Sequence, residues 1–122
     1  MKRLNILLTL VLLLPVFYIS CVYNSEEDLY PEECNTVNVT FSLTIRPILA
    51  NNCLTCHSNA NAAGSGNGVR LEDYVDVQAR SALISAAINH TGTYPMPKNS
   101  AKLKPCLIDQ FETWLSEGAL NN

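Results

Sequence analysis

Residues 53–57 read Cys-Leu-Thr-Cys-His, and this pentapeptide restricts what the chain can fold into more than any other feature. With 5 cysteines and 2 histidines among 122 residues, chance would produce the pattern in roughly 0.3% of chains of this composition. The spacing suits covalent haem attachment, because two thiols can add to the two vinyl groups on one porphyrin edge while the adjacent imidazole reaches the iron. The pattern predicts haem c, with Cys53 and Cys56 as thioether anchors and His57 as the proximal iron ligand.

Three other interpretations of the pentapeptide stay open. A Cys-x-x-Cys redox pair belongs near a βαβ pattern, which this sequence lacks. A zinc site would need further ligands, for which His90, Cys34 and Cys106 are the remaining candidates. A local disulfide between Cys53 and Cys56 is the simplest alternative. We favour haem attachment because it uses all three functional side chains of the pattern.

The first twenty residues predict a signal peptide of the lipoprotein type. Met1-Lys2-Arg3 precedes an uncharged, leucine-rich run that stops at Cys21, too short and too abruptly ended for a transmembrane helix. Tyr18-Ile19-Ser20-Cys21 resembles a bacterial lipobox, although lipoboxes prefer Leu at the position of Tyr18. This resemblance implies that lipid on Cys21 attaches the mature protein to a membrane. Plain secretion and an uncleaved anchor are the alternatives.

Residues 21–33 are expected to form an acidic tether, because they carry five carboxylates and few apolar groups. The cluster Ser25-Glu26-Glu27-Asp28 resembles an acidic export signal of surface lipoproteins in Bacteroidetes-type bacteria, the alternative being a solvated linker. The whole chain has a net charge of −3, so no surface for nucleic acid is expected. The expected location is the cell envelope, lipid-anchored in the periplasm or outer membrane or exposed at the surface.

Residues 34–122 are expected to form one all-α domain, because no segment alternates at a period of two. Thr44 is placed to cap a helix that begins at Ile45, accepts Pro47 in its first turn and leads into Cys53. A helix in one or two pieces is predicted over 73–89, and a last helix begins at Pro105 and ends before Gly118. Loops are expected over 59–68 and 91–104. The residues expected to be buried are Ile45, Ile48, Leu49, Val77, Leu83, Ile84, Ala87, Ile88, Leu107, Ile108, Phe111, Trp114 and Leu115.

The order of these features resembles that of class I c-type cytochromes. Ile45-Arg46-Pro47-Ile48-Leu49 precedes the pentapeptide, Tyr94-Pro95-Met96-Pro97-Lys98 and Leu103 follow it, and Phe111-Glu-Thr-Trp114-Leu115 comes last. The likeness is greatest to small monohaem lipoprotein cytochromes of Bacteroidetes-type bacteria and covers nearly all of residues 34–120. It implies the small cytochrome c fold, with about three to four helices around one covalent haem. It also implies electron transfer with redox partner proteins in the envelope.

Met96 is the expected distal iron ligand. Apart from Met1 it is the only methionine, and Pro95 and Pro97 restrict the backbone on both sides of it. In the cytochromes that the chain resembles, the methionine of this Met-Pro pair is the distal ligand. A gap-filling side chain is the alternative for Met96. His90 is the other candidate ligand. Its simpler roles are to face the last carbonyls of a helix end or to contact the haem edge.

Cys34 and Cys106 are expected to form a disulfide. They lie just before the first helix and at the start of the last, in an oxidising compartment, and the terminal helices of the expected fold pack together. Two inert buried thiols are the alternative.

The expected function is single-electron transfer with no bond-making chemistry, so no enzyme activity is expected and no catalytic residue is assigned. Arg70 is a candidate partner for a haem propionate, or a solvated arginine. Lys98, Lys102 and Lys104 form a small basic patch that either steers an acidic redox partner or is simply solvated. The alternatives for function are a haem protein whose Met96 is displaced, so that the iron binds a gas or peroxide, and a haem-free disulfide module.

Overall fold

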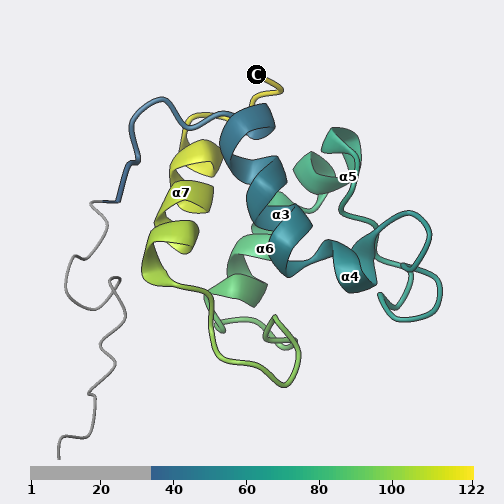
Figure 1. Cartoon of the computed structure of the whole chain (residues 1–122). Helices are drawn as coiled ribbons and strands as arrows, with labels where there is room; N and C mark the ends of the chain where they lie inside the picture. Colours follow the sequence, from purple (N-terminus) through teal and green to yellow (C-terminus); the bar gives the residue numbers. More distant parts are fainter. Residues whose placement is uncertain (1–33) are drawn as a thin grey trace, which may run out of the picture. The chain divides into compact units, whose positions relative to one another are not determined.

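The regular structure of the described residues is helical. The computed structural model describes residues 34–122, and no strand occurs among them, which confirms the all-α class for this part of the chain. The predicted signal peptide, the lipidated Cys21 and the acidic tether lie outside the described residues. In chain order the helices are the π-helix η2 (Phe41–Ile45), α3 (Arg46–Asn52), α4 (Leu54–His57), α5 (Tyr74–Ala79), α6 (Ser81–Ile88) and α7 (Pro105–Ser116) (Figure 1).

The first helix begins one turn earlier than the sequence suggested. The cap is Thr40 and not Thr44, because the Thr40 hydroxyl accepts a hydrogen bond from the Leu43 N–H at 3.2 Å. The first turn is wide, since the Ile45 N–H donates to Thr40 O, five residues back, at 3.1 Å. A proline lacks an N–H, and its ring crowds the carbonyl four residues before it. The wide turn accommodates Pro47 within a continuous helix, and the prediction for Thr44 was wrong.

The helix predicted over 73–89 is two helices. α5 and α6 are separated at Arg80, whose φ of −113° and ψ of 8° interrupt the helical geometry. Ile84 and Ile88 are the buried residues of α6, four positions apart and therefore on one face. Leu83 lies about a quarter turn away from that face. It is 72% exposed, so its predicted burial was wrong.

α7 has the boundaries that its sequence predicted. Pro105 is its first residue, and Gly118 follows its end with a φ of +96°, a left-handed conformation that glycine adopts at little cost. The tail beyond α7 returns to the first helix. There Asn122 accepts hydrogen bonds from the N–H groups of Phe41, through its side chain at 2.8 Å, and Ser42, through its main chain at 2.9 Å. The tail thereby caps N–H groups that a helix cannot satisfy internally.

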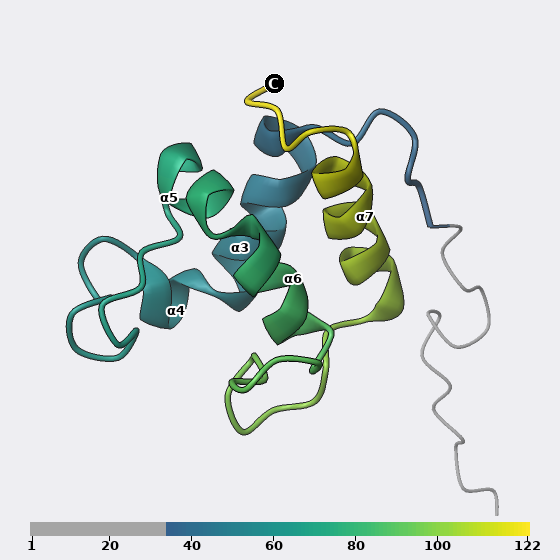
Figure 2. The same ribbon diagram turned by 180° about the vertical axis from the view of Figure 1, so that it is seen from behind.

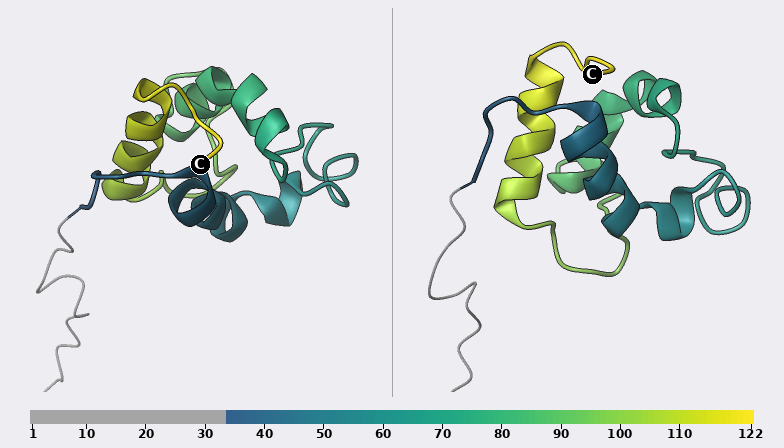
Figure 3. Two further views of the ribbon diagram at one scale, coloured as in Figure 1. Left: turned by 90° about the horizontal axis from the view of Figure 1, so that it is seen from above. Right: turned by 45° about the horizontal axis from the view of Figure 1, so that its top comes forward.

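Phe41 joins η2, α5 and α7 at the centre of an aromatic cluster. Its ring centroid lies 5.1 Å from that of Tyr74, in an edge-to-face arrangement, and 5.8 Å from that of Trp114. Trp114 is 1% exposed and donates from Nε1 to Leu120 O at 2.9 Å. α7 contacts both η2 and α6; Figure 3 shows it beside the first helix, and Figure 2 shows it beside α6. α7 is therefore the common support of the two helices that lead to the candidate site.

Residues 34–40 run along α7 before the first helix begins. Cys34 is bonded to Cys106 at the start of α7, with the two Cα atoms 5.3 Å apart, in agreement with the predicted disulfide. One turn further along α7, Gln110 Nε2 donates to Asn35 O at 2.9 Å. The disulfide joins residues separated by 72 positions and so closes nearly the whole domain into one loop.

Replacing both cysteines, as Cys34→Ser and Cys106→Ser, is expected to lower the free energy of unfolding by about 4 kcal/mol, because in the chain-entropy model a cross-link over a long loop restricts the unfolded chain. Denaturant titration of the wild type and the double variant measures the difference. A reducing agent should bring the wild type to the stability of the variant. Free thiols at both positions, found in peptides mapped without reduction, would contradict the pairing.

Candidate functional site

The C-x-x-C-H segment is the short helix α4 and the residue before it. Cys53 terminates α3, with its N–H donating to Leu49 O at 2.8 Å, and the His57 N–H donates to Cys53 O at 2.9 Å. The segment therefore continues directly from the first helix, as expected. Cys53 is partly buried and Cys56 is exposed, and both are free thiols. Neither sulfur is part of a disulfide, so the alternative of a local disulfide between them is not present in the structure.

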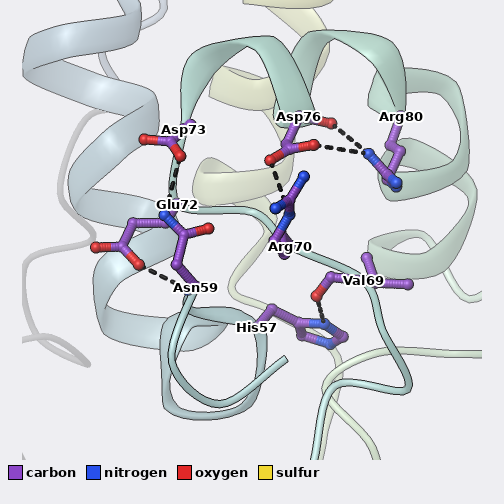
Figure 4. A network of polar contacts seen from close by, with 8 residues as sticks. All are labelled: His57, Asn59, Val69, Arg70, Glu72, Asp73, Asp76 and Arg80. Carbon is purple, nitrogen blue, oxygen red and sulfur yellow. Dashed lines mark hydrogen bonds and ion pairs between the residues drawn. The ribbon is translucent and has the colours of Figure 1, made fainter. Parts of the chain in front are cut away.

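The His57 ring is held by the main chain of a residue beyond the glycine-rich loop. His57 Nδ1 lies 3.0 Å from Val69 O (Figure 4). Because a carbonyl only accepts, Nδ1–H donates, and in the neutral ring Nε2 keeps its lone pair. A second link, the Leu71 N–H donating to His57 O at 2.9 Å, fixes the same segment against α4. This pattern, in which one ring nitrogen is bound to a carbonyl and the other is left as a ligand, is typical of metal-binding histidines.

Gly66 lies against α4, where any side chain would collide. A Cβ at this position would lie 2.6 Å from Cys56 O, 2.9 Å from the Cα of Ala62 and 3.0 Å from His57 Nδ1. The loop can therefore approach the histidine only because residue 66 has no side chain. The sequence alone indicated only that Gly66 belongs to a loop, and it did not identify Val69, whose contribution is a main-chain carbonyl. The glycine content of 59–68 was the one signal that pointed to a close approach.

Charged side chains secure the far end of the same loop. Asp76 pairs with Arg70 through Nε and with Arg80 through Nη1, each at 3.3 Å, and Arg70 remains 57% exposed (Figure 4). Asn59 donates from its N–H to Glu72 Oε2 at 2.7 Å and from Nδ2 to Asp73 Oδ2 at 2.9 Å. The loop is thus fixed on both sides of the Val69 carbonyl that the histidine binds. Arg70, the candidate partner for a haem propionate, forms an ion pair with Asp76 in this structure.

Burial raises the pKa of the Cys53 thiol from 9.0 to about 11, because an apolar surrounding disfavours the thiolate. Reactive redox cysteines have the opposite property, a lowered pKa that supplies the thiolate at neutral pH. Cys53 is therefore a poor candidate for the attacking thiol of a disulfide exchange enzyme.

Met96 lies in the long loop between α6 and α7, which occupies the lower edge of the view in Figure 1. The side chain is partly buried, and the Met96 N–H donates to Ala87 O, near the end of α6, at 3.0 Å. The His90 ring is bound to the same residue, with Nε2 3.0 Å from Met96 O. The structure therefore brings Met96 and His90 together at the end of α6. It places the three residues of the pentapeptide motif, Cys53, Cys56 and His57, on a separate element.

Comparison with known proteins assigns no family to the chain. No family model, curated protein or solved structure matches it. Within the described part, no group of three or more His, Cys, Asp or Glu residues is arranged to hold a metal ion. None of the helices from Phe41 onward is long and apolar enough to cross a bilayer.

Substituting Gly66→Ala is expected to destabilise the protein by roughly 2 kcal/mol or more, because the added methyl group must displace backbone atoms. Gly64→Ala is the matched control, since its Cβ would meet nothing closer than Asn61 O at 3.8 Å. The control should stay within about 0.5 kcal/mol of the wild type. Chemical denaturation measures both variants. Equal stability of the two would mean that the loop does not pack on His57 as described.

The raised pKa predicts a pH dependence for alkylation of Cys53 before any cofactor is attached. Labelling by iodoacetamide requires the thiolate, so it should stay slow through pH 9 and accelerate only towards pH 11. In urea the same residue should react near its ordinary pKa. Peptide mass spectrometry gives the rate at Cys53 separately. Rapid labelling of the folded chain at pH 8 would contradict the burial of this thiol.

Proposed function

We propose that this protein binds one haem c covalently and transfers single electrons. The observation that carries the proposal is the state of His57: its Nδ1–H is donated to Val69 O, which leaves Nε2 as an iron ligand beside two free thiols. A histidine that only stabilised the loop would need no cysteines at this spacing. A zinc site would use both thiols and His57 but would need a further ligand, and Cys34 and Cys106 are already paired with each other. A redox pair would use the thiols but would give His57 no matching role.

Cys53 and Cys56 would attach the haem through thioether bonds. Each S–H adds across a vinyl C=C, with sulfur bonding to one carbon and hydrogen going to the other, so the addition needs no oxidant. Because α4 continues from α3, the attachment points would be fixed to the domain's first helix.

A close loop contact at Gly66 and two exposed apolar side chains elsewhere in the domain are compatible with a bound flat apolar group. Gly66 leaves room for the loop to close on the histidine without a side chain entering the space beside it. Leu83 on α6 and Tyr94 in the loop between α6 and α7 are 72% and 75% exposed, which leaves much of their apolar surface in contact with water. A bound macrocycle would supply apolar surface for such residues.

Met96 would complete the coordination of the iron as the distal ligand. When bound, the haem supplies a one-electron couple between ferric and ferrous iron. With both Met96 and His57 bound to the iron, no ligand position would be left for a substrate, which favours electron transfer over catalysis. His90 is the second candidate ligand; its Nε2 is bound to Met96 O, so only its Nδ1 would be left to bind the iron.

The partners we propose are other redox proteins, and the site of action is the cell envelope. Lipid on Cys21 and cleavage after residue 20 belong to this proposal and rest on the sequence pattern at the N-terminus. The acidic residues between Cys21 and Cys34 would separate the domain from the membrane surface.

The covalent cofactor is tested by coexpressing the full chain with a cytochrome c maturation system. Wild-type protein should keep its haem absorbance after acid–acetone extraction or denaturation, whereas Cys53→Ala with Cys56→Ala should lose at least about nine-tenths of it, because no thioether remains. Thr55→Ala, which changes the exposed residue between the two cysteines, is the control. Normal haem content in the double variant would refute the proposal.

Met96→Ala tests the distal ligand. Oxidised wild-type protein should show the weak near-infrared band of His–Met haems, and the variant should lose it. The reduction potential should fall in the variant, because the soft thioether sulfur stabilises ferrous iron more than water or imidazole does. His90→Ala should keep the band. The opposite pattern, with ligation changed by His90→Ala and not by Met96→Ala, would make His90 the ligand.

A further inference from the structure

The chain between α6 and Met96 forms a closed hydrogen-bonded loop. At its base, the N–H groups of Thr91 and Gly92 both donate to Ala86 O, at 3.0 and 3.1 Å, and the Met96 N–H donates to Ala87 O at 3.0 Å. The backbone turns sharply at His90, whose φ is +57°. The His90 ring then spans the loop, because its Nε2 lies 3.0 Å from Met96 O.

We propose that His90 is a positioning residue, which holds Met96 in place through its ring rather than binding the iron. Nε2–H donates and Met96 O accepts, so the backbone on both sides of the Met96 side chain is fixed: the N–H by Ala87 and the carbonyl by His90. This inference rests on the proposed role of Met96 as distal ligand. It adds a reason why a histidine stands at this position.

Asn89, the residue before His90, links this hydrogen-bonded loop to α7. Asn89 donates from Nδ2 to Glu112 Oε1 on α7 at 2.7 Å, and Ser85 on α6 donates from its hydroxyl to the same oxygen at 2.6 Å. The end of α6 is thereby fixed to α7. The His90 ring therefore extends from a backbone segment that is fixed to α7. Movement of the Met96 main chain must break the hydrogen bond from this ring or disturb α6.

The left-handed backbone at His90 permits a clean test. Glycine adopts a φ of +57° without strain, so His90→Gly removes the ring and leaves the turn intact. His90→Gln keeps an N–H donor on a side chain of similar reach. Thr91→Ala is the control, because it removes a neighbouring hydrogen bond, from Thr91 Oγ1 to Ala86 O at 3.3 Å, that does not involve Met96.

Two measurements on the full chain test the proposal. In the ferric holoprotein, His90→Gly should bind added imidazole about fivefold more tightly, since displacing Met96 no longer breaks a hydrogen bond of about 1 kcal/mol. Without haem, hydrogen exchange of the Met96 amide should be about fivefold faster in His90→Gly. The Gly92 amide should stay unchanged as an internal reference. The conservative variant His90→Gln and the control Thr91→Ala should leave both quantities near the wild type.

Unchanged imidazole affinity and unchanged exchange in His90→Gly would overturn the proposal. So would an unprotected Met96 amide in the wild type, or a wild-type spectrum without the His–Met band, because Met96 would then not be the ligand that His90 positions. If the wild-type chain attaches no haem, the proposed function fails, and the exchange experiment still decides whether His90 holds the loop.

Discussion

The contact between Phe41 and Trp114 supports the rest of the domain. It fixes the first helix on α7, and the first helix ends at Cys53, directly before the short helix α4 that carries His57. α7 also contacts α6, whose last carbonyls bind the loop that carries Met96. Both groups of candidate ligands are therefore supported by the same helix. A large-to-small change at Trp114, which is 1% exposed, would remove packing that both groups share.

The sequence predicted the helices where local chemistry alone determines them. Pro105 and Gly118 bound α7 as expected, because proline suits a first turn and glycine a left-handed residue after the last. It failed at Thr44, where a wide turn before Pro47 moves the start of the helix, and at Leu83, where the break at Arg80 sets which face of α6 is buried. The first error comes from a local feature, the wide turn that begins at Thr40, and the second depends on the packing of α6, which no single segment encodes.

The candidate site also combines features that the sequence predicts with features that it does not. The residue types and spacing of Cys53, Cys56 and His57 are visible in the sequence. The group that orients His57 is not visible, because the Val69 carbonyl is a main-chain atom common to every residue. The space at Gly66 and the bond from His90 to Met96 likewise follow only from the folded chain. A motif can identify ligands, but their orientation comes from backbone groups distant in sequence.

The disulfide has a mechanical consequence. Cys34 is the first described residue, and its sulfur is bonded to the start of α7. Tension applied through the preceding segment would therefore pass into α7 through a covalent bond. The helix that carries Cys53 and His57 would remain unloaded, because the chain between Cys34 and Phe41 lies behind that bond. If the domain were pulled from its N-terminal side, the disulfide would prevent unfolding from starting at Cys34. His57 would then keep its orientation.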